Sequence, residues 1–131
     1  MAIKVNHIKP EFIDERGHIS RVVDQDEYPL RAVLYIKRKK ATRGADHFHK
    51  KDAHFIYVLK GKVKYSEKDM NKKNSSIESV ILNPGDVVLS RPMMAHSTVF
   101  LEDSIIFAYT TEKRDQESYE RDTVRVDFFE K

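Results

Sequence analysis

The sequence predicts an all-β fold in a single domain, and three observations lead to this prediction. Over roughly the first hundred residues, apolar positions alternate with polar ones or run in short blocks, and no helical periodicity lasts longer than about two turns. Candidate strands recur about every ten residues, with turn residues between them. The chain has 131 residues, a common size for one hydrophobic core. We therefore expect one small β-sandwich or β-barrel over residues 1–131.

Each predicted strand is a short apolar or alternating run bounded by turn residues or charge. Between these runs, Lys60-Gly61 is typical of a tight hairpin, and Pro84-Gly85 occupies the centre of a turn. Residues 69–76 are polar and predict an exposed loop. The strands expected in chain order are Ile19–Val23, Ala32–Lys37, His54–Leu59, Lys62–Ser66, Ile77–Leu82, Asp86–Leu89, Ser97–Phe100 and Ser104–Thr110.

The last twenty residues become strongly charged and predict a short C-terminal extension. Within it, residues 115–121 favour a brief helical turn. A final strand is expected at Val124–Phe129.

Composition excludes several classes of function. The chain has no cysteine, which excludes disulfides, thiolate zinc sites, iron-sulfur clusters and thiol nucleophiles, so any metal must be held by His, Asp or Glu. Its 24 basic and 21 acidic residues are interspersed, and the net charge of +3 favours small anionic ligands over nucleic acid. Without a membrane-length apolar run or an apolar signal core, we expect a soluble, cytoplasmic protein that binds no membrane.

Histidines provide the main functional signal. Of the six in the chain, His47, His49 and His54 fall within eight residues. On an extended strand His47 and His49 share one face, with Cα atoms about 7 Å apart. His54 and His96 each open a predicted strand that a barrel would bring alongside this pair. The four imidazoles are therefore expected to surround one cavity.

The spacing of these histidines resembles that of the cupins. The first cupin motif is His-x-His, three or four residues, Glu, six residues, Gly; here it is His47-x-His49, four residues, His54, six residues, Gly61. The second motif places a His eleven positions after a Gly with a Pro between them, as Gly85, Pro92 and His96 do. This resemblance implies a cupin jelly-roll β-barrel, and such domains are commonly homodimers.

The flanking segments are similar to a narrower group of cupins. Residues 12–17 resemble the opening of deoxysugar 3,5-epimerases. Residues 28–36, followed by Arg43-Gly44, resemble the dTDP-4-keto-6-deoxyglucose 3,4-ketoisomerases, although two residues rather than one separate Gly44 from His47. The tail at Tyr119–Asp122 is similar to the closing segment of the same enzymes.

This resemblance implies an isomerase or epimerase of a nucleotide-activated 4-keto-6-deoxysugar, serving polysaccharide or antibiotic-sugar synthesis. His47 or His49 would remove the proton next to the ketone, and Arg43 would bind the diphosphate or the developing enolate. Tyr109 is the candidate proton donor, because a strand face shared with Ile105 and Phe107 could line the barrel interior. No organic cofactor is implied.

Two other readings of the same residues stay open. His47, His49, His54 and His96 suit one divalent ion such as Zn, Fe, Ni or Mn. The alternatives are therefore a non-catalytic cupin that binds a carbohydrate or a metal, and a metal-dependent cupin dioxygenase that uses His47, His49 and His96.

Overall fold

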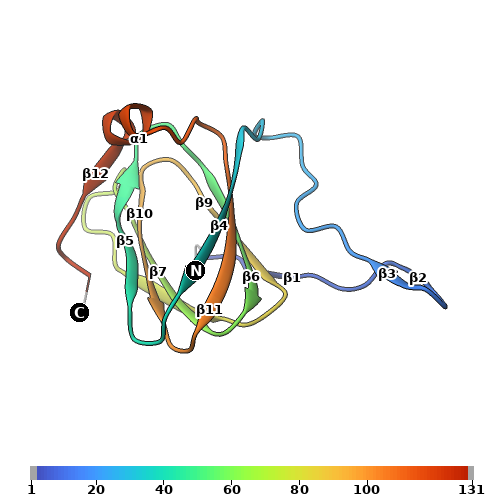
Figure 1. Ribbon diagram of the computed structural model, residues 1–131. Coiled ribbons are helices and arrows are strands. Elements are labelled where there is room, and N and C mark those ends of the chain that lie inside the picture. Colours follow the sequence, from blue (N-terminus) through green and yellow to red (C-terminus); the bar gives the residue numbers. More distant parts are fainter. Residues whose placement is uncertain (1–2, 130–131) are drawn as a thin grey trace.

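The computed structural model describes residues 3–129 and consists mostly of strands (Figure 1). Its one helix in that range has seven residues, and no helix in the described part of the chain is long and apolar enough to span a bilayer. The elements are β1 (Asn6–His7), β2 (Phe12–Asp14), β3 (Gly17–Ile19), β4 (Ala32–Arg38), β5 (Arg43–His49), β6 (His54–Lys60), β7 (Val63–Asp69), β8 (Glu78–Leu82), β9 (Asp86–Ser90), β10 (Met94–Phe100), β11 (Ser104–Thr110), α1 (Gln116–Asp122) and β12 (Thr123–Arg125).

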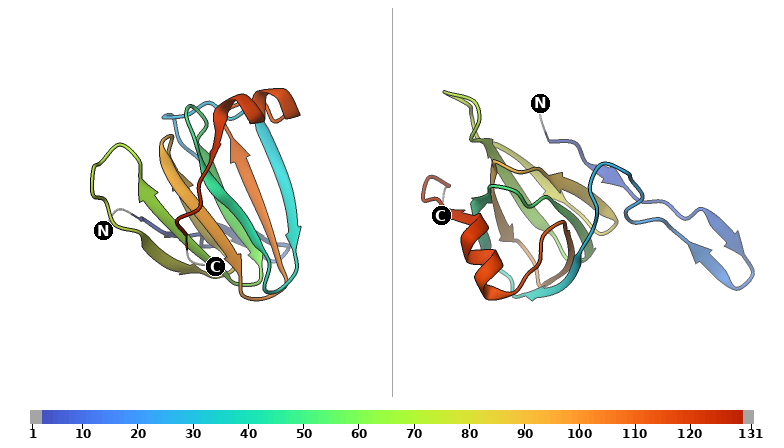
Figure 2. Two further views of the ribbon diagram at one scale, coloured as in Figure 1. Left: turned by 90° about the vertical axis from the view of Figure 1, so that its left-hand side faces the viewer. Right: turned by 90° about the horizontal axis from the view of Figure 1, so that it is seen from above.

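Two five-stranded antiparallel sheets lie face to face (Figures 1 and 2). The first sheet has the order β1-β9-β6-β11-β4 and the second β12-β5-β10-β7-β8. Within residues 3–129 no strand ladder joins the two sheets, so the all-β class is confirmed but the closed barrel is not. Helix α1 covers one end of the space between the sheets (Figure 1).

The hydrophobic core fills the part of this space that lies away from α1. It is formed where alternate residues of both sheets point inward, as strands with one solvated face require. Val58 and Ile106 of the first sheet meet Val63, Tyr65 and Phe100 of the second, and all five are at most 4% exposed. The core therefore leaves the end of the sandwich under α1 for polar side chains.

Both predicted turns are present, but neither closes a hairpin, because β6 and β7 belong to different sheets, as do β8 and β9. Gly61 lies between β6 and β7 with φ of +97°, and a Cβ atom there would approach the carbonyl oxygen of Asp103 to 2.6 Å, so only glycine fits. At the second corner, the Asp86 amide donates to the Asn83 carbonyl at 2.9 Å. The Asp86 carboxylate in turn accepts from the Asn83 amide at 2.7 Å.

Two predicted strands are shorter than expected. The strand predicted at Ile19–Val23 is wrong beyond Ile19, because β3 ends there and Arg21 instead pairs with Glu11 and Asp24 in an irregular segment. The final strand predicted at Val124–Phe129 is limited to β12, which ends at Arg125. β5 was missing from the predicted strands, although its two histidines were expected in extended backbone.

The hairpin of β2 and β3 projects away from the sandwich (Figures 1 and 2). It carries exposed apolar side chains at Phe12, Ile13 and Ile19, which are 61%, 71% and 64% exposed. Such an arm buries little of its own apolar surface within this chain.

Candidate active site

Four histidines meet at the end of the sandwich under α1. His47 and His49 end β5, His54 begins β6, and His96 lies opposite His47 in the ladder between β10 and β5. The ring centroids of His47 and His96 are 4.8 Å apart, and both His47 and His54 lie 4.6 Å from His49. All four residues are at most 7% exposed. The structure therefore brings together the histidines whose spacing resembles the cupin motifs.

A cavity of about 140 Å³ extends from these histidines into the sandwich. His47, His54 and His96 line its polar end, whereas His49 lies behind them. Its other walls are mainly aliphatic, apart from two arginines and one tyrosine. These lining residues are Leu34, Ile36, Arg38, Gly44, Ala45, Ile56, Thr98, Phe100, Ile106, Ala108, Arg114 and Tyr119.

The hydrogen bonds of His49 fix which of its nitrogens carries the proton. The Thr123 hydroxyl donates to the Tyr119 carbonyl at 2.6 Å, so its oxygen accepts from Nδ1 of His49 at 3.2 Å. Nδ1 also faces a carboxylate oxygen of Asp122 at 3.5 Å. Nε2 is then the unprotonated nitrogen, and it is buried without a hydrogen-bond partner among the described residues. A buried acceptor nitrogen without a hydrogen bond destabilises the folded protein unless it binds a ligand or accepts a proton.

His54 is held by a buried carboxylate. Its Nε2 lies 2.7 Å from Asp52, which is 3% exposed and also accepts from the Thr111 amide at 2.9 Å. Arg114 approaches the same carboxylate at 3.7 Å. Burial raises the pKa of Asp52, but the hydrogen bond and positive charge of His54, together with the hydrogen bond from the Thr111 amide, outweigh it and lower the pKa to about 2. Asp52 is therefore an anion that orients His54.

Burial keeps the other imidazoles neutral. Loss of solvent, and then the positive charge of His54, lower the pKa of His47 to about 4. Burial and then His47 lower the pKa of His96 to about 3, and the pKa of His49 also lies far below its usual value because of burial. At neutral pH these three side chains can accept a proton or donate a lone pair to a metal.

Tyr119 and Arg114 line the cavity but were not predicted as site residues. The Tyr119 hydroxyl lies 3.4 Å from Nδ1 of His47, and the Arg114 guanidinium sits over the Tyr119 ring at 4.4 Å. α1 carries Tyr119, and the segment before α1 carries Arg114, so both reach the histidines only through the C-terminal extension. The similarity noted at Tyr119–Asp122 was the one available signal for this segment.

Arg43 does not line the cavity, contrary to the role expected for it. Ala45 and Asp46 both have positive φ, and the pairing of β10 skips Asp46 between His47 and Ala45, which identifies a β-bulge. One extra residue reverses the face of everything before it. Arg43 therefore bonds Asp46 and Ser97, each at 2.9 Å, on the outer face of the second sheet.

Tyr109 also lies away from the cavity. On β11, Ile106 and Ala108 point inward and are at most 4% exposed, so Ile105, Phe107 and Tyr109 face outward. The Tyr109 ring stacks on Phe107 at 6.4 Å. The expectation that Tyr109 lines the interior was therefore wrong.

Two overlapping groups have the geometry to bind a cation. One nitrogen each from His47, His49 and His96 lie within 4.8 Å of one another, and so do ligand atoms of His49, Asp52 and His54. Bonds of about 2 Å to one ion require ligand atoms at most about 4 Å apart, so small side-chain shifts would close either group.

Comparisons with known proteins point to a group of sugar-nucleotide enzymes. A family model described as "FdtA: WxcM-like, C-terminal" matches residues 1–130. No curated protein gives a significant sequence match.

Solved structures with the same fold include two ketoisomerases and an epimerase. QdtA, a 3,4-ketoisomerase from Thermoanaerobacterium thermosaccharolyticum crystallised as a double mutant with TDP, has a TM-score of 0.73 at 23% identity, covering 94% of this chain and 86% of that one. WlaRA, a TDP-fucose-3,4-ketoisomerase from Campylobacter jejuni, has a TM-score of 0.74 at 16% identity, with coverage of 95% and 89%. The dTDP-4-dehydrorhamnose 3,5-epimerase of Bacillus anthracis, with TDP and PPi bound, has a TM-score of 0.73 at 18% identity, with coverage of 89% and 76%. These similarities establish the shared fold.

Proposed function

Because the chain belongs to the family described as "FdtA: WxcM-like, C-terminal", we propose that it is an isomerase or epimerase of a nucleotide-activated 4-keto-6-deoxysugar. The observation that carries this proposal is a neutral, buried His47 that faces a cavity of about 140 Å³ beside a tyrosine hydroxyl. Related structures with the same fold are described as acting on TDP sugars. The cytoplasm, where we expect the protein, is a suitable place for such a reaction.

The cavity residues suggest how the reaction proceeds. His47 takes the proton from the carbon beside the ketone; the C–H electron pair moves into a C=C bond, and the carbonyl oxygen becomes an enolate. Arg114 supplies a positive charge for that oxygen, the task expected of Arg43. Tyr119, rather than Tyr109, is placed to return a proton, because its hydroxyl lies 3.4 Å from His47 and lines the cavity.

Solvent exchange tests the chemistry directly. In deuterated water the protein should incorporate deuterium next to the ketone of a TDP-4-keto-6-deoxysugar, because the removed proton exchanges with solvent. Tyr119→Phe should lower this incorporation by about tenfold or more, and the matched change Tyr109→Phe should leave it unaltered. Absence of exchange with TDP and UDP sugars alike would favour the non-catalytic binding module.

Metal binding is the second candidate function, and the unpartnered Nε2 of His49 favours it. His47, His49 and His96 would hold a divalent ion as neutral imidazoles, and burial keeps them in that state. Such an ion would polarise a ketone oxygen as a Lewis acid, or serve a dioxygenase if it were iron. The same three residues then serve as ligands instead of bases.

Elemental analysis of protein purified without a histidine tag separates these functions. We expect less than about one tenth of an equivalent of Zn, Fe, Ni or Mn if the histidines act as bases. His96→Asn should then leave metal content unchanged. One equivalent of iron, lost in His96→Asn, would instead support the dioxygenase.

We propose further that the protein forms a homodimer through the outer face of the first sheet. That face presents Val33 and Tyr35, each 59% exposed, beside Phe107 and Tyr109. The projecting β2–β3 hairpin carries a second exposed apolar surface. A second copy of the chain could cover both, since patches of this kind are uncommon on monomers.

Replacing Val33 and Tyr35 with Lys should weaken this dimer at least about tenfold, because two charges would have to be buried in an apolar interface. Sedimentation velocity at several protein concentrations measures the effect. Ile81→Lys is the matched control, because Ile81 is 47% exposed on β8 of the other sheet. A wild-type protein that stays monomeric at every concentration would contradict the proposal.

A further inference from the structure

The cavity beside the histidines is too small for a whole sugar nucleotide. Its volume of about 140 Å³ compares with roughly 300–1,000 Å³ for sites that hold drug-sized ligands. One sugar ring can enter it, but the diphosphate and nucleoside cannot. These groups must therefore lie outside the cavity when the sugar is at the histidines.

Chemistry fixes the end of the cavity at which the diphosphate must emerge. In a hexose, the path from either C3 or C5 to the first phosphorus has four bonds of about 1.5 Å each, so this phosphorus lies within about 6 Å of the reacting carbon. Arg38 also lines the cavity, but it lies six positions along β4 from Ala32, which shares the register of Thr110 and His54. Six strand residues span about 20 Å between Cα atoms, so Arg38 reaches the cavity from the end opposite His54, away from the reacting carbon.

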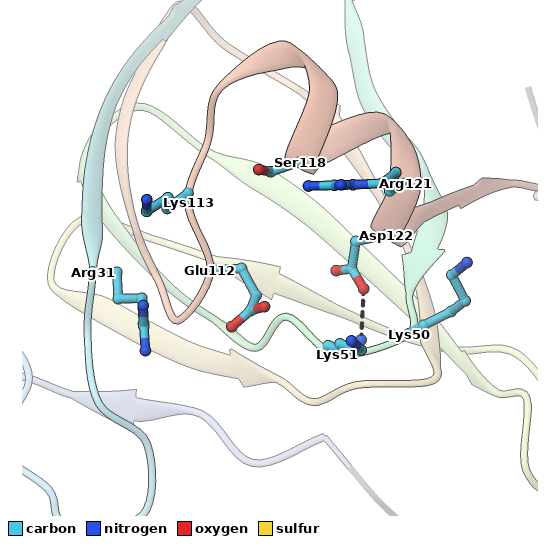
Figure 3. A pocket seen from close by; sticks show the side chains of 8 residues that line it. All are labelled: Arg31, Lys50, Lys51, Glu112, Lys113, Ser118, Arg121 and Asp122. Atoms are coloured by element: carbon cyan, nitrogen blue, oxygen red, sulfur yellow. Dashed lines mark hydrogen bonds between the residues drawn. The ribbon is translucent and has the colours of Figure 1, made fainter.

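A cationic hollow lies at the histidine end. Its volume is about 570 Å³, and five basic side chains line it from four different parts of the chain. Figure 3 shows Arg31 and Lys113 on one side, Lys50 and Lys51 on the other, and Arg121 on α1 above them. Arg31 immediately precedes β4, which places it in the register of His54.

The hollow and the cavity share their dividing wall. Lys113 lines the hollow, while Arg114, the next residue, lines the cavity. On α1, Ser118 and Arg121 line the hollow, while Tyr119 lines the cavity. A ligand that crosses this wall would therefore place two joined groups in the two spaces.

The charge of the hollow suits a diphosphate. Its five cations face two carboxylates, Glu112 and Asp122, which leaves a net charge of +3. Asp122 already accepts from the backbone amides of Lys51 and Asp52 at 2.8 and 3.1 Å, and these contacts hold it in the wall. Arginine forks and lysine ammonium groups are the usual partners of phosphate oxygens.

We propose that this hollow, lined by Arg31, Lys50, Lys51, Lys113 and Arg121, binds the diphosphate of the sugar nucleotide while the sugar occupies the histidine cavity. The assignment rests on the proposed function for the identity of the sugar. In this assignment the hollow has the diphosphate-binding role that was expected of Arg43. Arg43 instead bonds Asp46 and Ser97 on the outer face of the second sheet.

Two matched pairs of neighbouring lysines test the assignment. Lys50→Ala/Lys51→Ala removes two cations from the hollow, and Lys39→Ala/Lys40→Ala removes two from the turn at the other end of β4. Calorimetry with TDP and with inorganic pyrophosphate should show Kd raised at least about tenfold in the first variant and within about twofold of wild type in the second. Added salt should weaken wild-type binding of both probes.

The outcomes separate this proposal from the proposed reaction. If both variants lost the same affinity, or only Lys39→Ala/Lys40→Ala lost affinity, the assignment of the hollow as the diphosphate site would be wrong. The proposed reaction, which solvent exchange tests separately, would not be affected. If pyrophosphate binding depends on Lys50 and Lys51 but no deuterium enters a keto sugar, the assignment of the hollow as a diphosphate site would stand. The proposed isomerase or epimerase reaction would then be wrong. A wild-type protein that binds neither probe at about 1 mM would overturn the hollow.

Discussion

Replacing His47 with Asn should lower deuterium incorporation next to the sugar ketone by about two to four decades, the usual worth of a positioned acid-base group. Asparagine keeps much of the size of the imidazole but cannot take the proton. His47 is the histidine that combines a lowered pKa, a place in the cavity wall and contact with the Tyr119 hydroxyl. Mass spectrometry or proton NMR of the recovered sugar measures the exchange.

The second histidine of the motif provides the sharpest comparison. His49 lies behind the cavity wall, with Nδ1 engaged by Thr123, so His49→Asn should lower exchange by no more than about tenfold. His18→Asn, on the exposed β3, should have no effect. If His49→Asn were the more damaging change, the base would be His49. If exchange survived both substitutions, neither histidine would be the base.

The sequence predicted the meeting of the four histidines because strand geometry makes spacing informative. His47 and His49 are two residues apart and share a face, and antiparallel pairing places His96 opposite His47. Turns at Gly61 and Gly85 return the chain to the same end of the sandwich after each strand. Local rules of this kind are enough to bring β5, β6 and β10 together.

The same rules could not assign the faces of β11 or the start of β5. Residues 105–109 are all apolar, so no alternation of polar and apolar residues shows which face of the strand points to the core. Only the burial of the side chains shows that Ile106 and Ala108 point inward and Tyr109 outward. At β5 the two residues between Gly44 and His47 form a bulge, and a bulge reverses the face of Arg43. Tyr119 reaches the cavity by long-range packing of α1, which no periodicity describes.

The buried histidines should also make the protein sensitive to mild acid. In the unfolded chain a histidine titrates near 6.5, whereas in the folded protein the pKa of His47 is about 4 and that of His96 about 3. Between these values the unfolded chain binds more protons, so the free energy of unfolding decreases as pH falls below about 6.5. The pKa of His49 is lowered as well, so for three histidines the loss at pH 5 is about 6 kcal/mol, a large part of the roughly 5–15 kcal/mol typical of a domain.

Urea denaturation at fixed protein concentration, at pH 7.5 and pH 5 and with a chelator present, measures this loss. His47→Asn should remove about one third of it, since one of the three groups no longer titrates, whereas His18→Asn should leave it unchanged because that side chain is exposed on β3. The carboxylate of Asp52 does not confuse the result, because its lowered pKa moves its own contribution to pH values below about 4. Equal stability at the two pH values would mean that these imidazoles titrate in the folded protein as they do in the unfolded chain, which would contradict their lowered pKa values.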